Sequence, residues 1–340
     1  MLINFFTGVA NEVRTLMATL GVTQLVDLIG RTDLLELLDS SQYKNVDLSE
    51  TLELSGITSN YPRYYTEASF SHDRGVMNQR IHADCMEAVY NLESLTKEYS
   101  IYNTDRSVGA TLAGEIAKNY GDAGLDSPIK LSFNGIAGQS FGVWAIKGME
   151  LYLNGEANDY VGKGLAGGKI VIRQVNPNIV SQVAVMGNTC LYGATSGYLF
   201  ANGVAGDRFA ARNSGVISVI EGVASNGCEY MTGGAVAILG TIDQNFGAGM
   251  TGGVCYIWDS FDKVIPNLNA DVELVSADKL AETENSHREF VYELLSQHYK
   301  ETHSLRAAQF LADFDSNFAE LAIIKPKNIS LTNLINYLMK

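Results

Sequence analysis

The chain has 340 residues, 46% of them hydrophobic, and a formal net charge of −14 at pH 7. This acidic balance argues against binding to nucleic acid or to anionic membrane surfaces, because both require basic patches. No apolar run approaches the roughly 20 residues that cross a bilayer, and no signal-peptide pattern opens the chain. The four cysteines (Cys85, Cys190, Cys228 and Cys255) form no Cys-x-x-Cys pair. We therefore expect buried thiols in a protein of the reducing cytoplasm.

Residues 1–40 are predicted to be helical. One helical face carries an apolar stripe, and Gly21 follows it as a helix-ending residue. The stripe consists of Val9, Val13, Leu16, Met17 and Leu20. Little sequence before the stripe could cover it, so we interpret residues 1–40 as the helical tail of an upstream synthase-like domain.

Residues 41–127 are predicted to be a linker and helices that lead into the repetitive segment 128–262, described below. The stretch to residue 72 is polar and extended, and a helix is expected from Gly75 to Leu92. A second helix of about twelve residues should be capped within residues 103–107 and should end before Gly121.

Residues 128–262 repeatedly show a glycine followed by a short apolar run. The glycines lie 20, 29, 18, 19 and 19 residues apart, at Gly148, Gly168, Gly197, Gly215, Gly234 and Gly253. We interpret the spacing of 29 as one coil with an insertion around Asn176–Asn178. A constant period near 20 residues indicates one unit stacked on itself, and such short apolar runs suit a parallel β-solenoid. A β-sandwich, the alternative, would show turns every 8–12 residues. The six glycines are predicted to be structural turn residues with positive φ.

Residues 263–340 are predicted to form a C-terminal helical tail. A helical pattern extends from Ala277 to Leu321, and Pro326 ends it. Its apolar positions are Phe290, Leu294, Leu295, Phe310, Leu311, Phe314 and Phe318.

One stretch imitates a serine nucleophile. Gly138–Gly142 matches Gly-x-Ser-x-Gly around Ser140, a motif that requires a helix directly after the serine. A β pattern follows instead, and the downstream histidines (His287, His298 and His303) fall in what reads as a polar helical tail. We therefore expect Ser140 to be a corner residue, and an enzyme using Ser140 is kept as a lesser hypothesis.

Other apparent motifs also favour structural roles. Gly162–Gly167 matches the dinucleotide motif Gly-x-Gly-x-x-Gly, but a strand pattern follows where that site needs a helix. The separations of 38 and 27 residues between the last three cysteines match no compact iron–sulfur ligand set. Glu156 and Asp159 are expected to cap turns. The sequence thus predicts no catalytic, cofactor-binding or metal site in this chain.

Several long motifs together point to one family. Residues 158–169, 193–197, 201–215 and 229–234 resemble the Gly-x-Gly-x-Gly domain of the glutamate synthase large subunit. Residues 12–22 and 28–35 resemble the end of that enzyme's FMN-binding synthase domain. Residues 103–109 resemble the entry to its β-helix, and residues 324–327 resemble the closing tail. A subunit of formylmethanofuran dehydrogenase has similar coils, but the flanking helical segments favour glutamate synthase.

The resemblance implies a right-handed parallel β-helix that holds the amidotransferase and FMN synthase domains in register. That enzyme converts glutamine and 2-oxoglutarate into two glutamates, with FMN and an iron–sulfur cluster in its upstream domains. The implied partners are those domains, on the same or a separate chain, with the enzyme's small subunit as a further candidate. This chain alone is then expected to be inactive and to bind no cofactor. The alternative is a free-standing β-solenoid that binds a ligand or a protein.

Overall fold

The computed structural model describes residues 1–36, 47–53, 64–65, 67, 75–174, 183–281 and 285–338. The chain forms two compact units, Met1–His72 and Asp73–Lys340. The proposed insertion at Asn176–Asn178 and most of the predicted linker to residue 72 lie outside the described residues.

The first unit contains one long helix, α1 (Leu2–Thr19), as predicted. Gly21 follows it at a φ of 69°, a conformation that suits glycine at a helix end. The remaining elements are short: η1 (Leu25–Leu28), η2 (Thr32–Leu34) and α2 (Ser49–Leu52). No residue of α1 is buried.

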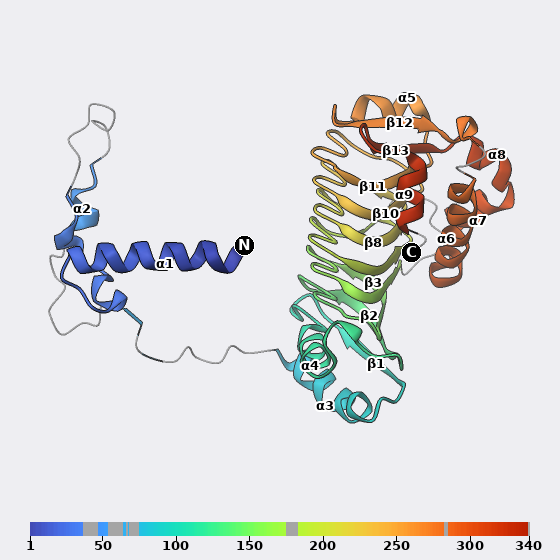
Figure 1. Cartoon of the computed structure of the whole chain (residues 1–340). Helices are drawn as coiled ribbons and strands as arrows, with labels where there is room; N and C mark the ends of the chain where they lie inside the picture. The colour runs from blue at the N-terminus through green and yellow to red at the C-terminus, as the bar shows by residue number, and fades with distance from the viewer. Residues whose placement is uncertain are drawn as a thin grey trace. The chain divides into compact units, whose positions relative to one another are not determined.

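The second unit is built on a β-solenoid of about six turns, which confirms the predicted fold class (Figure 1). Its long sheet contains eight parallel strands: β1 (Leu95–Ile101), β2 (Ile129–Ala137), β3 (Met149–Ala157), β4 (Ala166–Arg173), β6 (Ser196–Ala201), β8 (Ser214–Ile220), β10 (Thr232–Ile238) and β11 (Gly252–Ile257). A short second sheet extends from the end of β3 through β5 (Ala184–Met186), β7 (Val204–Ala205) and β9 (Gly222–Val223).

The register of the long sheet explains the apolar runs. Residues at equivalent offsets stack on successive coils, and alternate residues face opposite sides of the sheet. One stack fills the solenoid interior: Leu131, Leu151, Ile170, Leu199, Ser218, Val236 and Cys255. The adjacent stack faces outward: Tyr152, Val171, Phe200, Val219, Ala237 and Tyr256. Because the outer stack is also buried, a second hydrophobic cluster must cover it.

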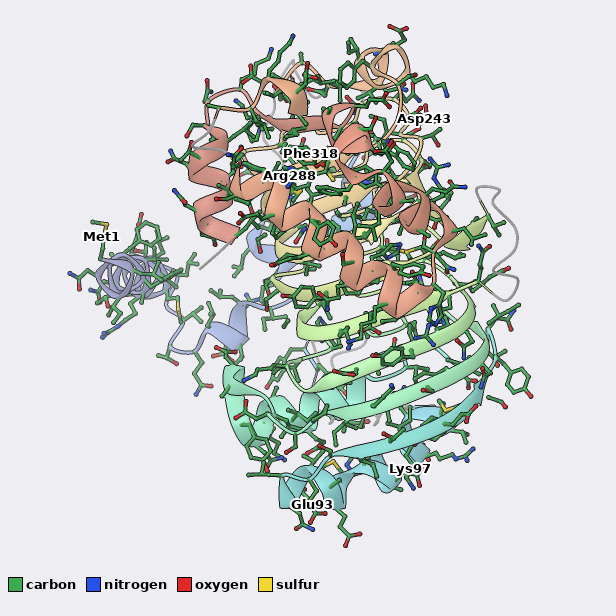
Figure 2. The ribbon with its side chains drawn as sticks, turned by 90° about the vertical axis from the view of Figure 1, so that its right-hand side faces the viewer. Met1, Glu93, Lys97, Asp243, Arg288 and Phe318 are labelled. Atoms are coloured by element: carbon green, nitrogen blue, oxygen red, sulfur yellow. The ribbon has the colours of Figure 1, made fainter. Side chains whose placement is uncertain are left out.

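Helices provide this cover. The outer stack packs against α6 (Ser286–Thr302), α7 (Leu305–Ala312) and α8 (Phe314–Ala319). Figure 2 faces this side, where Arg288 and Phe318 mark α6 and α8 near one end of the solenoid. Phe310 is fully buried there, as the predicted apolar faces of this segment require.

Two strands that the sequence analysis did not predict flank the helical stretch Ala277–Leu321 of the C-terminal tail. β13 (Ala322–Pro326) pairs antiparallel with β11, and β12 (Val272–Ser276) pairs with β13. They end the parallel stack together with α5 (Phe261–Val264) and η5 (Ile265–Asn267), while η6 (Ala277–Lys279) and α9 (Leu331–Leu338) complete the tail. These strands have a physical reason: the last coil leaves an open sheet edge, and paired or covered edges avoid unwanted association.

The opposite end of the solenoid is covered by α3 (Val76–Asn91), α4 (Ala110–Tyr120) and η4 (Gly121–Ala123) (Figure 1). Both helices lie close to their predicted positions, but the predicted cap of α4 within residues 103–107 is wrong. Gly109 occupies the N-cap position at a φ of 96° and makes no side-chain cap. Its N–H donates instead to Asn78 Oδ1 of α3, at 3.0 Å. A tertiary contact thus replaces the local cap.

Candidate functional site

The described coils of the solenoid share a wall of left-handed turns. In every coil, three alternate residues have φ between 53° and 75°. We call these eighteen residues the turn wall: Ser140, Gly142, Trp144; Tyr160, Gly162, Gly164; Thr189, Leu191, Gly193; Arg208, Ala210, Arg212; Asn226, Cys228, Tyr230; Asn245, Gly247, Gly249. Only six are glycines, although the left-handed conformation costs other residues ~1–2 kcal/mol each.

Hydrogen bonds between coils hold the turn wall in this conformation. In the second coil, Tyr160 and Gly164 donate their N–H groups to the next coil, each at 2.9 Å, while Gly162 donates to Phe141 O of the preceding coil at 2.9 Å. The third coil repeats the pattern, since Leu191 donates to Val161 O at 2.7 Å. Alternating conformations thus turn the donors toward both neighbours, and these bonds offset the backbone strain.

The six predicted turn glycines lie at a different place, where each coil enters the long sheet. Gly148, Gly197, Gly234 and Gly253 have positive φ, as predicted. Gly168 and Gly215 do not, so the expected reason for glycine is wrong at these two positions. A Cβ on Gly215 would lie 2.1 Å from Thr195 O, and one on Gly168 would lie 3.0 Å from the Ala145 side chain. Close approach of the preceding coil therefore requires glycine there.

A polar ladder runs along the edge of the turn wall. Asp159 Oδ1 accepts from Asn188 N at 2.7 Å, and Asn188 Oδ1 accepts from Asp207 N at 2.8 Å. Asp207 Oδ1 continues the ladder to Ser225 N at 3.0 Å. Asp159 therefore caps a turn, as expected. Glu156 has an exposed side chain and lines a groove instead.

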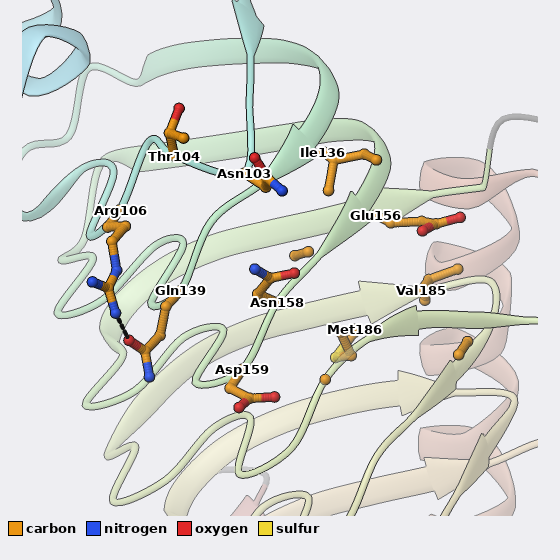
Figure 3. Close-up of a pocket in the computed structure, with 13 residues that line it drawn as sticks. Asn103, Thr104, Arg106, Ile136, Gln139, Glu156, Asn158, Asp159, Val185 and Met186 are labelled. Carbon is orange, nitrogen blue, oxygen red and sulfur yellow. Dashed lines mark hydrogen bonds between the residues drawn. The ribbon is translucent and has the colours of Figure 1, made fainter.

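This groove has a volume of about 710 Å³ and lies beside the first coils. Figure 3 shows Arg106 bonded to Gln139 on one side, with Asp159 and Glu156 farther along the groove. The lining mixes one cation with two carboxylates, and Asp159 is already engaged in the polar ladder. The groove therefore does not present the pair of available carboxylates that acid–base catalysis uses.

The motifs that imitate active sites belong to the turn wall. Ser140 has a φ of 66°, and its N–H donates to Asp159 O of the next coil at 2.8 Å. No helix follows it; turns lead into β3. Gly162 and Gly164 are likewise turn-wall residues, and strand β4 follows. Neither stretch therefore provides the helix N-terminus that a nucleophile elbow or a pyrophosphate site requires.

The cysteines are buried thiols. All four are free and buried, and Cys228 Sγ lies 3.5 Å from Cys255 Sγ. Burial raises the pKa of Cys85 to about 11 and of Cys190 to about 12, so the thiolate that metals bind is disfavoured. Among the residues that the structure describes, no group of three or more His, Cys, Asp or Glu could hold a metal ion. The four described cysteines therefore do not fit an iron–sulfur ligand set.

Two histidines that we expected in a polar tail are fully buried under the helices. His287 Nε2 lies 3.0 Å from Leu331 O, which can only accept, so this nitrogen carries the proton. His287 Nδ1 then accepts from the Tyr256 hydroxyl at 2.6 Å. His298 packs near Phe200, and its ring nitrogens have no hydrogen-bond partner in the described structure. Both histidines pack between the helices and the sheet, and neither forms a catalytic group with Ser140.

The junction of α6 and α7 is bonded directly to the coils. Ser304 Oγ donates to the buried Glu221 carboxylate, and Asn202 Nδ2 donates to Thr302 O at 3.3 Å. Burial raises the pKa of Glu221, partly opposed by the bond from Ser304 and the nearby Arg306 charge. Sequence reasoning missed this junction because its partners are more than 80 residues apart.

Among the described residues, no helix is long and apolar enough to cross a membrane.

Comparison with known proteins identifies the family of this chain. A family model described as the GXGXG motif matches residues 78–327. Ferredoxin-dependent glutamate synthase 2, chloroplastic, of Arabidopsis thaliana is 42% identical over 325 residues, which are 94% of this chain and 20% of that protein. The chloroplastic enzyme of Spinacia oleracea is 42% identical over 320 residues, covering 92% of this chain and 20% of the relative. Ferredoxin-dependent glutamate synthase 2 of Synechocystis sp. is 43% identical over 323 residues, with coverages of 92% and 20%. The chain thus spans about one fifth of the length of these curated relatives.

Proposed function

This chain belongs to the GXGXG-motif family, and we propose that it is the part of a glutamate synthase that holds the amidotransferase and FMN synthase domains in register. The observation that carries the proposal is the match of 94% of this chain to 20% of a relative that is named a glutamate synthase. In this proposal the rigid solenoid serves as a structural support and supplies no catalytic residue. The full activity, formation of two glutamates from glutamine and 2-oxoglutarate, needs the other domains.

The surface of α1 supports an assembly role. The apolar stripe lies along one face of the helix, and Phe5, Leu16 and the C-cap residue Leu20 are 63%, 59% and 54% exposed. Exposed apolar patches of this kind commonly mark protein contacts. The remainder of the enzyme, on the same or a separate chain, is the partner that we propose for this face; the small subunit is a further candidate.

We further propose that this chain binds no FMN and no iron–sulfur cluster, and that both belong to the other domains. The burial of all four free thiols and the absence of a phosphate-cradling loop before a helix within the described residues support this assignment. The four free thiols also suit a reducing compartment, so a cytoplasmic location stays part of the proposal. The division of the chain at residues 40, 127 and 262 likewise remains a prediction.

A free-standing solenoid that binds a ligand or a protein is the second candidate. The groove beside the first coils is the observation that favours it. A free-standing module, however, should be a well-behaved monomer, whereas the α1 face should make an isolated chain prone to association.

Co-expression with a fragment that carries the amidotransferase and FMN domains tests the assembly. We expect the two to co-purify in equal amounts. Leu16→Glu should weaken the complex at least about tenfold, because it places a charge in an apolar contact. The matched control is Asn11→Glu, which adds the same charge on the opposite face of α1 and should leave binding unchanged.

The outcomes test the assembly role and the use of α1 as its contact separately. If the wild-type chain does not co-purify and is a monomer alone, the assembly role is wrong. If the wild type binds and Leu16→Glu binds equally well, the assembly stands but α1 is not its contact.

A further inference from the structure

A second pocket lies where β2, β3 and β4 approach the junction of α6 and α7. Its volume is about 450 Å³, within the range of small-molecule sites. We call it the Arg173 pocket; it is lined mainly by Asn134, Asn154, Arg173, Asn202, Thr302 and His303. Its described lining contains no Asp or Glu, although the chain has 38 such residues. The lining residues themselves carry no carboxylate, and the neighbouring Glu98 carboxylate accepts a hydrogen bond from Asn134.

Arg173 is held in place and lacks a carboxylate partner. Its Nε donates to the backbone carbonyl of Glu301 at 2.6 Å, and its guanidinium lies 5.3 Å from the centre of the Tyr152 ring. The Glu301 carboxylate is engaged by Lys169 at 2.9 Å, and Lys169 also lies 3.3 Å from Glu150. No ion pair to Arg173 occurs among the described residues. Its terminal nitrogens thus remain available to a ligand.

Two oriented side-chain amides line the same pocket as Arg173. Asn134, Asn154 and Arg173 occupy the same register position on three adjacent strands. Asn154 Nδ2 donates to Asn134 Oδ1 at 2.9 Å, and Asn134 Nδ2 donates to Glu98 Oε1 at 2.6 Å. Each of these amide nitrogens has two hydrogens, so one donor on each is still available. The pocket therefore combines one fixed cation with several neutral donors.

We propose that the Arg173 pocket binds a small organic anion through a carboxylate group. The planar guanidinium presents a fork of donors that matches a carboxylate in two parallel hydrogen bonds. Its position is set before binding, by the Glu301 carbonyl and the Tyr152 ring, so less conformational freedom is lost when the ligand binds. This site is independent of the assembly role and needs no other domain.

Isothermal titration of the full chain at constant ionic strength tests the proposal. Glutarate is the probe, its neutral diamide glutaramide is the matched control ligand, and inorganic phosphate tests a general anion site. We expect saturable glutarate binding with a Kd of about 1 mM, the strength that a small ligand gains from a few polar contacts. Glutaramide should not bind measurably, and phosphate should bind more weakly than glutarate.

Two variants locate the binding. Arg173→Gln should weaken glutarate binding at least tenfold, and Arg208→Gln, which removes an exposed arginine elsewhere on the solenoid, should not. Asn154→Asp leaves Arg173 in place but adds a negative charge beside it, and should weaken binding to a similar degree. Circular dichroism confirms that each variant is folded. Absence of saturable binding, equal binding by Arg173→Gln, or preference for phosphate would each overturn the carboxylate assignment.

Discussion

Replacing Gly234 with valine should lower the free energy of unfolding by about 3–5 kcal/mol, because strain, overlap and lost inter-coil bonds act together. Gly234 has a φ of 80°, and a Cβ there would lie 2.3 Å from Val216 O of the preceding coil. A β-branched residue is a strong outlier at positive φ. The added atoms must also push apart two coils that are joined through the long sheet. Urea denaturation followed by circular dichroism gives the measurement.

Gly193→Ala is the matched control for this prediction. Gly193 also has positive φ, 62°, but apart from its chain neighbours no heavy atom lies within 4 Å of the position of its Cβ. Only the conformational cost applies, and we expect a loss of ~1 kcal/mol. If Gly234→Val costs no more than Gly193→Ala, close contact between the coils does not determine stability at this position.

Acid should destabilise the second unit through His298. Burial lowers the pKa of His298 to about 3, whereas the pKa of histidine in an unfolded chain is about 6.5. Between these values the unfolded state binds a proton that the folded state excludes. Stability from this group is therefore complete above pH ~6.5 and falls by ~1.4 kcal/mol per pH unit below it, roughly 4–5 kcal/mol in all.

The difference between wild type and His298→Leu isolates this contribution from that of the carboxylates. At pH 7 the variant should be as stable as the wild type or more stable, because it removes a buried group without hydrogen-bond partners. Toward pH 4 the variant should lose clearly less stability than the wild type. The control is His303→Asn, since His303 is exposed and has a φ of 57° that asparagine tolerates. Equal acid sensitivity of wild type and His298→Leu would show that His298 is not protected from protonation.

The solenoid could be predicted from the sequence because its determinants are local. The glycine period and the apolar runs directly reflect stacked coils, and the cysteines are buried as predicted. The extent of the turn wall could not be predicted in the same way. Arg208, Ala210 and Arg212 adopt left-handed conformations only because neighbouring coils bind their backbone groups, and no residue type at these positions signals it.

Long-range packing accounts for the other differences. His287 follows a serine and precedes Arg288 and Glu289, so its local sequence reads as an exposed helix. Its burial depends on Tyr256, 31 residues away. β12 and β13 similarly depend on the edge of β11, which exists only once the coils have stacked. The Arg173 pocket arises from three strands and a helix junction, and no linear motif contains it.

The most direct test of the proposed function is reconstitution of activity. A fragment with the amidotransferase and FMN domains would be assayed for glutamate formation from glutamine and 2-oxoglutarate, with and without this chain. We predict that the fragment alone forms little glutamate from glutamine and 2-oxoglutarate. Adding this chain should restore glutamate formation, and the Ser140→Ala chain should restore it equally well. A fragment that is fully active without this chain, or a loss of activity with folded Ser140→Ala, would contradict a purely structural role.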